Sequence, residues 1–269
     1  MPQEFRDTTE PFPFEPQLVP LTLKMIEELA GKDPRKITVV DVGCGYGRLV
    51  NELRNNSVDC HGCDVDEFWD GDCSPYLRPI EMSPYRLPYD DESVDVVISN
   101  TILEHVHDHP ALYREIKRIL KPGGVAIHTL PSRWFVQPGK WYLPVEPHIR
   151  VPFVHFFWPR PATKKVPYWY FKLWAKLGFR SPYQKDKQPD EVARSNAEYC
   201  ATSLCYLPHS THVRMSREIF GNCEYPTDWF LRNAYGGAAR LYQKLPLKKA
   251  TRWILKQTRI SLMVQRKPG

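Results

Sequence analysis

The feature that most constrains the fold is a glycine-rich loop between an apolar run and a helical stretch. Residues 37–42 form a short β-branched run, the loop at 43–47 reads GCGYG, and helical spacing continues to about Asn55. Glycines let a backbone turn sharply and approach a ligand closely, and the helix that follows offers unpaired N–H groups at its N-terminus. A strand, a glycine turn and a helix in this order predict a ligand-binding βα unit.

Further strands and helices alternate along the first half of the chain. A helix is expected over 21–30 and another over 110–120, where Lys121-Pro122-Gly123-Gly124 gives a strong stop. Strands are expected at 58–63, near 79–82, at 94–99 and at 125–130, and a last one at 260–265. This alternation predicts an α/β fold with a doubly wound, mostly parallel sheet, which binds its ligand at the carboxyl ends of the strands.

Two acidic residues indicate the kind of ligand. Asp64 ends the second predicted strand, 21 residues after Gly43, where a carboxylate can accept both hydroxyls of a ribose. A dinucleotide fits poorly, because Arg48 stands where its fingerprint requires a small residue and Asp41 would repel a pyrophosphate. A cationic ligand removes that conflict. S-adenosylmethionine carries an ammonium and a sulfonium, so these residues favour it as the cofactor.

The chain resembles the class I S-adenosylmethionine-dependent methyltransferases, in particular the broad type 11 group. The resemblance lies between about residues 37 and 132, roughly a third of the chain, in the stretches VVDVGCGYGRLV, GCDVD, LPYDDESVDVVISNTILEHV and IKRILKPGGVAIHTLPS. It implies a Rossmann-like sheet of seven strands whose last strand, supplied by ISLMVQRK, runs antiparallel. It also implies that Asp41, Gly43 and Gly45 contact the methionine part of the cofactor and that Asp64 holds the ribose.

The chain departs from the family pattern at the adenine. The family often has an acidic residue before the LPY-like segment, and Ser83 occupies about that place here, with Met82 or Leu87 able to flank the ring. Asn100, after the fourth strand, is a secondary contact to the cofactor's amino-acid part. The expected cofactor-binding residues are Asp41, Gly43, Cys44, Gly45, Gly47, Asp64, Val65, Met82, Ser83, Leu87 and Asn100.

His105 is the candidate catalytic residue. Methyl transfer to an alcohol needs a base, and His105 lies just past the fourth strand, on the edge where ligands bind. The competing interpretation is that His105 only packs or caps a helical turn. Some relatives bind a divalent metal with an ExxEH segment, but Thr101 replaces the first carboxylate here, so we expect no metal.

Charge and proline divide the sequence into two unlike parts. Residues 1–130 carry 13 Lys/Arg and 23 Asp/Glu, whereas residues 131–269 carry 24 and 8. The segment 132–187, rich in proline and aromatics, begins where the fifth strand ends and is expected to be a cap insertion that selects the substrate. Most of its aromatics are expected to pack a small core of their own, and His148, Arg150 and His155 are the candidate substrate contacts.

The predicted organisation is a single methyltransferase domain over 1–269. It comprises an N-terminal arm and helix (1–34), a cofactor-binding core (35–131), the cap insertion (132–187) and a C-terminal completion of the sheet (188–269). No run of eighteen apolar residues and no leader pattern is present, and the seven cysteines are an odd number, so we expect a cytoplasmic protein with reduced thiols. Cys60 and Cys63 are expected to be buried thiols rather than metal ligands.

The acceptor is the least constrained part of the function. The basic second half favours O-methylation of a polar or anionic acceptor, such as a saccharide or a lipid- or phosphate-linked intermediate, and peripheral contact with an anionic membrane surface. Methylation of an aromatic or quinone-like molecule on carbon or oxygen is the alternative. A non-catalytic cofactor-binding or membrane-adaptor module ranks below both, and RNA methylation ranks last because no RNA-binding module is recognisable.

Overall fold

The computed structural model of the protein describes residues 17–65, 69, 74–132, 134–136, 143–146, 148–158, 165–235, 248–258 and 260–269. The chain divides into two compact units. The first, called here the sheet unit, comprises Phe12–Leu130, His209–Lys244 and Leu262–Gly269. The second, the helical unit, includes Pro131–Pro208 and Leu245–Ser261. The interpretation of residues 1–269 as a single domain stays a prediction.

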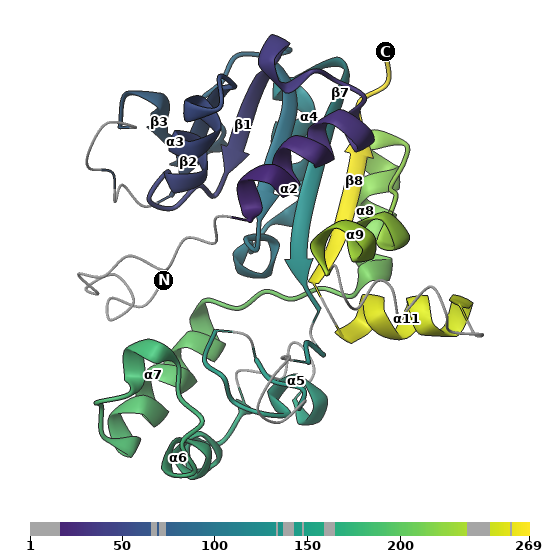
Figure 1. The fold of residues 1–269 in the computed structure, drawn as a ribbon. Helices are drawn as coiled ribbons and strands as arrows, with labels where there is room; N and C mark the ends of the chain where they lie inside the picture. The colour runs from purple at the N-terminus through teal and green to yellow at the C-terminus, as the bar shows by residue number, and fades with distance from the viewer. Residues whose placement is uncertain are drawn as a thin grey trace. The chain divides into compact units, whose positions relative to one another are not determined.

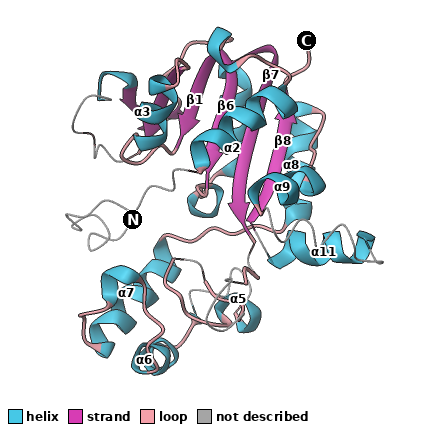
Figure 2. Cartoon of the chain, in the orientation of Figure 1, coloured by secondary structure: helices cyan, strands magenta, loops and turns pink. Residues whose placement is uncertain are grey.

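The sheet unit is built on six strands in the part of the chain that the structure describes, in the order β3-β2-β1-β6-β7-β8 (Figures 1 and 2). The first five pair in parallel, as the alternation of strands and helices predicts. The bounds are β1 Thr38–Val42, β2 Asp59–Asp64, β3 Leu77–Pro79, β6 Val94–Asn100, β7 Leu120–Pro131 and β8 Ile260–Arg266. A hairpin of β4 (Glu81–Met82) and β5 (Tyr85–Arg86) stands apart from this sheet.

Helices cover both faces of the sheet, with α2 crossing one face and α4 and α8 on the other (Figure 1). A strand covered on both faces buries apolar side chains on both, and Val94, Val96, Val97 and Ile98 of the central strand β6 are all buried. The helices of this unit are α2 Leu18–Met25, α3 Arg48–Asn55, α4 His109–Ile119, α8 His209–Phe220 and α9 Thr227–Ala234. Short turns of helix lie at Ile26–Ala30, Pro34–Lys36, Ser74–Tyr76 and Leu103–His105.

The last strand runs antiparallel to its neighbour, as the resemblance implies. The arrows of β7 and β8 point in opposite directions in Figure 1, and the backbone of Lys267 exchanges hydrogen bonds with Gly123 and Gly124 at the start of β7. The expected count of seven strands is wrong, since the sheet has six among the described residues. Among the described residues, the other side of β8 pairs only through an isolated antiparallel bridge between Val264 and Glu224. Pro226, two residues after Glu224, has no backbone N–H and does not extend this pairing into a strand.

Two further expectations concern the region around β2. The third strand lies at Leu77–Pro79 rather than near 79–82, because residues 81–86 turn back on themselves as the β4–β5 hairpin. Cys60 and Cys63 are fully buried free thiols, as expected, and burial raises the pKa of both.

The helical unit has a small core of its own. Its helices are α5 Val154–Phe157, α6 Tyr168–Lys176, α7 Pro189–Thr202 and α11 Lys248–Thr258, with a turn at Pro182–Gln184. Ile149, Phe171 and Tyr199 are among the buried side chains that pack together there. The core expected of the segment 132–187 therefore also contains residues from α7 and the chain after it, which the expected division assigned to the C-terminal completion of the sheet. The expected N-terminal arm up to residue 16 lies outside the described residues.

Among the described residues, we find no helix with both the length and the apolar character needed to span a bilayer.

A buried chain of hydrogen bonds ties the centre of the sheet to its last strand. The Ser99 hydroxyl on β6 donates to His128 Nδ1 at 2.7 Å, and His128 Nε2 donates to the Gln265 side chain at 3.2 Å. Gln265 in turn donates to Ser216 of α8 at 2.6 Å. Because His128 accepts at one ring nitrogen and donates at the other, it is held neutral, and burial lowers its pKa to about 4.

Stability should therefore depend on the protonation of His128. The unfolded imidazole has a pKa of about 6.5, so the neutral folded form contributes stability above that pH, and this contribution is lost as the pH falls toward 4. We expect His128→Gln to lose as much as about 3 kcal/mol of this pH-dependent stability, measured by chemical unfolding at pH 4–7. His61→Gln on β2 is the control, and equal pH profiles for His128→Gln and the wild type would contradict the assignment.

Candidate cofactor site

The loop between β1 and α3 crosses the carboxyl end of β2. The backbone N–H groups of Gly43 and Cys44 both donate to the Cys63 carbonyl, at 2.7 and 3.2 Å. Gly43 has a φ of +80°, and a Cβ there would lie 2.4 Å from Ile102, so the position requires glycine. Gly45 differs, because a Cβ there would meet no atom within 4 Å. The loop is thus packed at Gly43 and open at Gly45.

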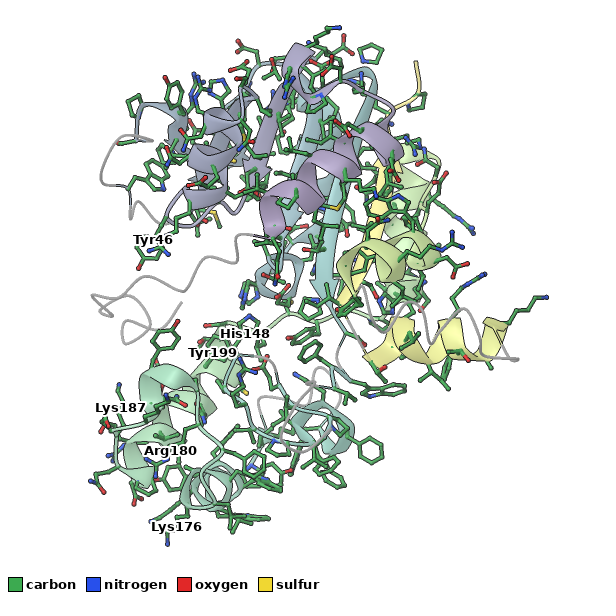
Figure 3. The ribbon with its side chains drawn as sticks, in the orientation of Figure 1. Tyr46, His148, Lys176, Arg180, Lys187 and Tyr199 are labelled. Atoms are coloured by element: carbon green, nitrogen blue, oxygen red, sulfur yellow. The ribbon has the colours of Figure 1, made fainter. Side chains whose placement is uncertain are left out.

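Asp64 joins the end of β2 to this open part of the loop. One carboxylate oxygen accepts from the Gly45 N–H at 2.8 Å and the other from the Val65 N–H at 2.7 Å. Both oxygens therefore lie beside the loop, and their contact with a ribose stays a prediction. Gly47, with a φ of +72°, then caps α3 at the far side of the loop, next to Tyr46 (Figure 3).

Asp41 is a buried carboxylate at the end of β1. It is only 3% exposed, and its Oδ1 has no hydrogen-bond partner among the described residues. Burial raises its pKa to about 7, and the charge of Asp64 adds to that effect. An unpaired buried carboxylate is costly, and a cation bound beside it would offset that cost. The site is therefore suited to a ligand that carries positive charge.

The turn after β6 packs directly on the glycine loop. Asn100 accepts from the Thr129 hydroxyl at 3.0 Å, whereas its side-chain nitrogen is buried without a partner in the described part of the chain. Thr101 follows with a φ of +51°, and Ile102 is the residue that fills the space at Gly43. The Leu103–His105 turn comes next. His105, which is half-buried, therefore lies three residues after Ile102, the residue that contacts the glycine loop.

The three residues expected near an adenine lie in or beside the β4–β5 hairpin. Met82 is 61% exposed and Ser83 follows it at the hairpin's turn. Leu87 is fully buried and is held to α4, since its N–H donates to Glu115 and its carbonyl accepts from Arg118. Of the two hydrophobic candidates, Met82 is the one with a side chain at the surface.

Trp69 is a contact that the sequence reasoning missed. Its indole N–H donates to the Gly45 carbonyl at 3.1 Å. Gly45 is therefore held by Trp69 at its carbonyl and by Asp64 at its N–H. In the sequence, the only indication of this contact is that an aromatic residue occurs five positions after Asp64, in a segment without hydrophobic periodicity.

This segment of the chain matches a known family. Residues 40–128 match the family described as "Methyltransferase domain", type 11. These residues contain the glycine loop, Asp41, Asp64 and the turn with His105. The segment 40–128 is therefore similar to the type 11 group of S-adenosylmethionine-dependent methyltransferases.

Curated relatives match less than half of the chain. A protein of Mycolicibacterium smegmatis named "Probable S-adenosylmethionine-dependent methyltransferase" is 28% identical over 120 residues, 44% of this chain and 45% of its own length. An "Uncharacterized methyltransferase" of Mycobacterium sp. (strain KMS) is 32% identical over 132 residues, 46% of this chain and 52% of its own. The match spans about half the length of these curated relatives.

Solved structures give a weaker likeness. An S-adenosylmethionine-dependent methyltransferase from Mesorhizobium loti is 15% identical with a TM-score of 0.47, and the match covers 91% of this chain and 98% of that one. A TM-score at this level adds nothing to the assignment of the methyltransferase segment.

The candidate substrate contacts of the helical unit gather around a residue that the sequence reasoning did not single out. Glu146 is fully buried, and its carboxylate accepts from the N–H groups of His148 and Ile149, the His148 ring and the Tyr206 hydroxyl, at 2.8–3.0 Å. His155 is buried edge-on against Tyr206, with ring centroids 4.7 Å apart. His148 lies beside Tyr199, as Figure 3 shows, with centroids 5.8 Å apart.

Glu146 is held ionised by these neighbours. Burial by itself would raise its pKa, but the charges and hydrogen bonds of His148, with the charge of His155 and the N–H of Ile149, lower the pKa to about 2. Arg150 also interacts with this carboxylate: burial lowers the pKa of Arg150, and the negative charge of Glu146 opposes that lowering. The three substrate candidates are therefore electrostatic neighbours of one carboxylate, and their contact with substrate stays a prediction.

Replacing Glu146 should destabilise the helical unit at neutral pH. Because the folded pKa lies below the ordinary value of 4.5, the carboxylate contributes stability above that pH and loses it as the pH falls toward 2. We expect Glu146→Gln to lower the unfolding free energy at pH 7 by about 2–4 kcal/mol, with the difference from wild type shrinking toward pH 2. Exposed Glu198→Gln on α7 is the control. A pH-independent difference would show that shape rather than charge matters.

Proposed function

We propose that the protein transfers a methyl group from S-adenosylmethionine to an oxygen atom of a polar or anionic acceptor. The observation that carries the proposal is the unpaired buried carboxylate of Asp41 beside the open glycine loop. When bound, the cofactor supplies an electrophilic methyl group on a sulfonium. The similarity of residues 40–128 to the type 11 group supports the same assignment.

In this proposal three residues beside the glycine loop bind different parts of the cofactor. Asp64 exchanges its bonds to Gly45 and Val65 for the two ribose hydroxyls, to which its two oxygens can accept. Asp41 faces positive charge, which favours its ionised form and lowers its raised pKa. The buried Asn100 amide has a free N–H to donate to a carboxylate.

His105 takes the acceptor's proton in this proposal. An alcohol is a weak nucleophile, and loss of its proton as the new bond forms to the methyl carbon assists the displacement. His105 is half-buried on the turn after β6, at the edge where a parallel sheet binds its ligands. The structure of the turn is fixed by the backbone hydrogen bond from His105 to Ile102 at 2.8 Å.

The acceptor class is inferred from charge. The segment 133–187 carries eleven Lys/Arg against Glu146 and Asp186, and the Glu146 carboxylate is buried and hydrogen-bonded to His148 and Tyr206. An excess of positive charge attracts anionic groups and repels cationic ones. A saccharide carrying acidic groups, or a phosphate- or lipid-linked intermediate, fits this charge better than a neutral aromatic molecule.

Cofactor binding should depend on Asp64 far more than on a matched aspartate at the other end of the same strand. We expect Asp64→Ala to weaken binding of S-adenosylmethionine by at least about tenfold in titration calorimetry, since a carboxylate bonded to hydroxyls contributes more than a neutral acceptor. Asp59→Ala, at the start of β2, should leave the affinity unchanged. Equal affinity of Asp64→Ala and wild type would remove Asp64 from the site.

Methyl transfer should require His105 but not its exposed neighbour. We expect labelled cofactor and wild-type enzyme to methylate an anionic glycan or lipid-linked component of a cell extract, detected by mass spectrometry. His105→Ala should lower kcat by about 100-fold with unchanged cofactor affinity, whereas His107→Ala should retain activity. Labelling confined to quinone-like molecules would overturn the acceptor class, and full activity of His105→Ala would overturn the base.

A further inference from the structure

Large apolar side chains gather on the outside of the helical unit at α5 and α6. Phe156 and Phe157 of α5 are 62% and 58% exposed, and Trp169 of α6 is 62% exposed. Leu173 and Leu177 are also exposed, at 45% and 60%. Exposed apolar side chains that occur singly need no explanation, but a group of this kind indicates an interaction surface.

The exposed side chains of α6 lie on one face of the helix. Trp169, Leu173 and Leu177 follow one another at intervals of four, so they form one stripe along the helix and its end. Tyr170, Phe171 and Ala175 are buried in the core of the helical unit. The helix thus has one apolar side that is buried in the core. Its outer side is also apolar, and packing within the unit does not account for that.

Ring contacts connect α5 with α6. The centroids of Phe156 and Phe157 are 5.4 Å apart, those of Phe157 and Trp158 5.9 Å, and those of Trp158 and Tyr170 4.8 Å. Trp169 lies 5.8 Å from Tyr170. Trp158 and Tyr170 thus connect α5 with α6, and the exposed apolar side chains of the two helices, Phe156, Phe157, Trp169, Leu173 and Leu177, are called here the aromatic face.

Basic residues accompany the aromatic face. Lys165 precedes α6, Lys172 and Lys176 lie on it, and Arg180 follows it. Figure 3 shows Lys176 extending outward from the end of the helix. Lys172 forms an ion pair with Asp190 at 2.7 Å, while no acidic residue occurs in the sequence from 147 to 185. The partner of this surface is therefore expected to be apolar in part and negatively charged.

We propose that the aromatic face binds the surface of an anionic lipid bilayer. Tryptophan favours the boundary between headgroups and acyl chains, because its ring is apolar and its N–H remains hydrated. The leucine and phenylalanine side chains enter the acyl region, while the lysine ammonium groups stay at the anionic headgroups. Nucleic acid would use the cations and rings but leave Leu173 and Leu177 without a role.

This proposal does not rest on the methyltransferase activity, so its test uses no cofactor. The full-length protein is sedimented with phosphatidylcholine vesicles that contain or lack phosphatidylglycerol. We expect binding to the anionic vesicles that weakens with added salt and is at least about tenfold weaker for neutral vesicles. Trp169→Ser combined with Leu177→Ser should weaken binding to anionic vesicles by more than about tenfold.

The matched control is Trp253→Ser on α11, because Trp253 is 60% exposed and also stands among basic residues. It should bind as wild type does. Since both sets of side chains are exposed, the melting temperature of each variant should match that of the wild type. Absent vesicle binding, or greater loss with Trp253→Ser than with the double variant, would overturn the proposal. Binding of the aromatic face to an RNA oligomer or to a second copy of the chain, without vesicle binding, would do so as well.

Discussion

The candidate site depends on the parallel pairing of β1 with both of its neighbours. Val39 to Val42 pair with β2 on one side, and Val39 to Asp41 pair with β6 on the other. Parallel strands bring their carboxyl ends to the same edge, so the glycine loop, Asp64 and the turn with His105 meet there although 62 residues separate Gly43 from His105. Ile102 then packs against Gly43, and this contact couples the geometry of the loop to that of the turn.

Two buried carboxylates show how the surroundings set the charge state of a site. Glu146 accepts four hydrogen bonds and has two histidines nearby, so its pKa is lowered to about 2 in spite of complete burial. Asp41 is equally buried but keeps an oxygen without a partner and has a second carboxylate close by, so its pKa is raised to about 7. The Glu146 carboxylate has its hydrogen-bond partners within the protein, whereas Asp41 keeps one oxygen without a partner among the described residues.

The two compact units have different physical characters that match different partners. The sheet unit holds an acidic site for a cationic ligand, and the helical unit carries the basic residues and the aromatic face. A small core around Ile149, Phe171 and Tyr199 buries one side of α6, which leaves the outer stripe from Trp169 to Leu177 unexplained by folding alone. The lipid interaction that we propose would give that stripe a function.

The sequence by itself determined the parallel strands, the glycine loop and the place of Asp64 at the end of the second strand, because these depend on short-range patterns: apolar runs, glycines and chain spacing. The hydrogen bond between Asp64 and Gly45 was seen only in the structure. The residue patterns placed the third strand two residues late, and the family resemblance implied one strand too many. Pairing at a sheet edge depends on hydrogen-bond partners from elsewhere in the chain, as the bridge between Glu224 and Val264 shows. Only the tertiary structure decided that Trp69 contacts Gly45, that Glu146 organises His148 and Tyr206, and that Trp158 and Tyr170 connect α5 with α6. These are contacts between side chains in segments without periodicity, and the free energy that selects them comes from packing and from buried charge, which local sequence does not encode.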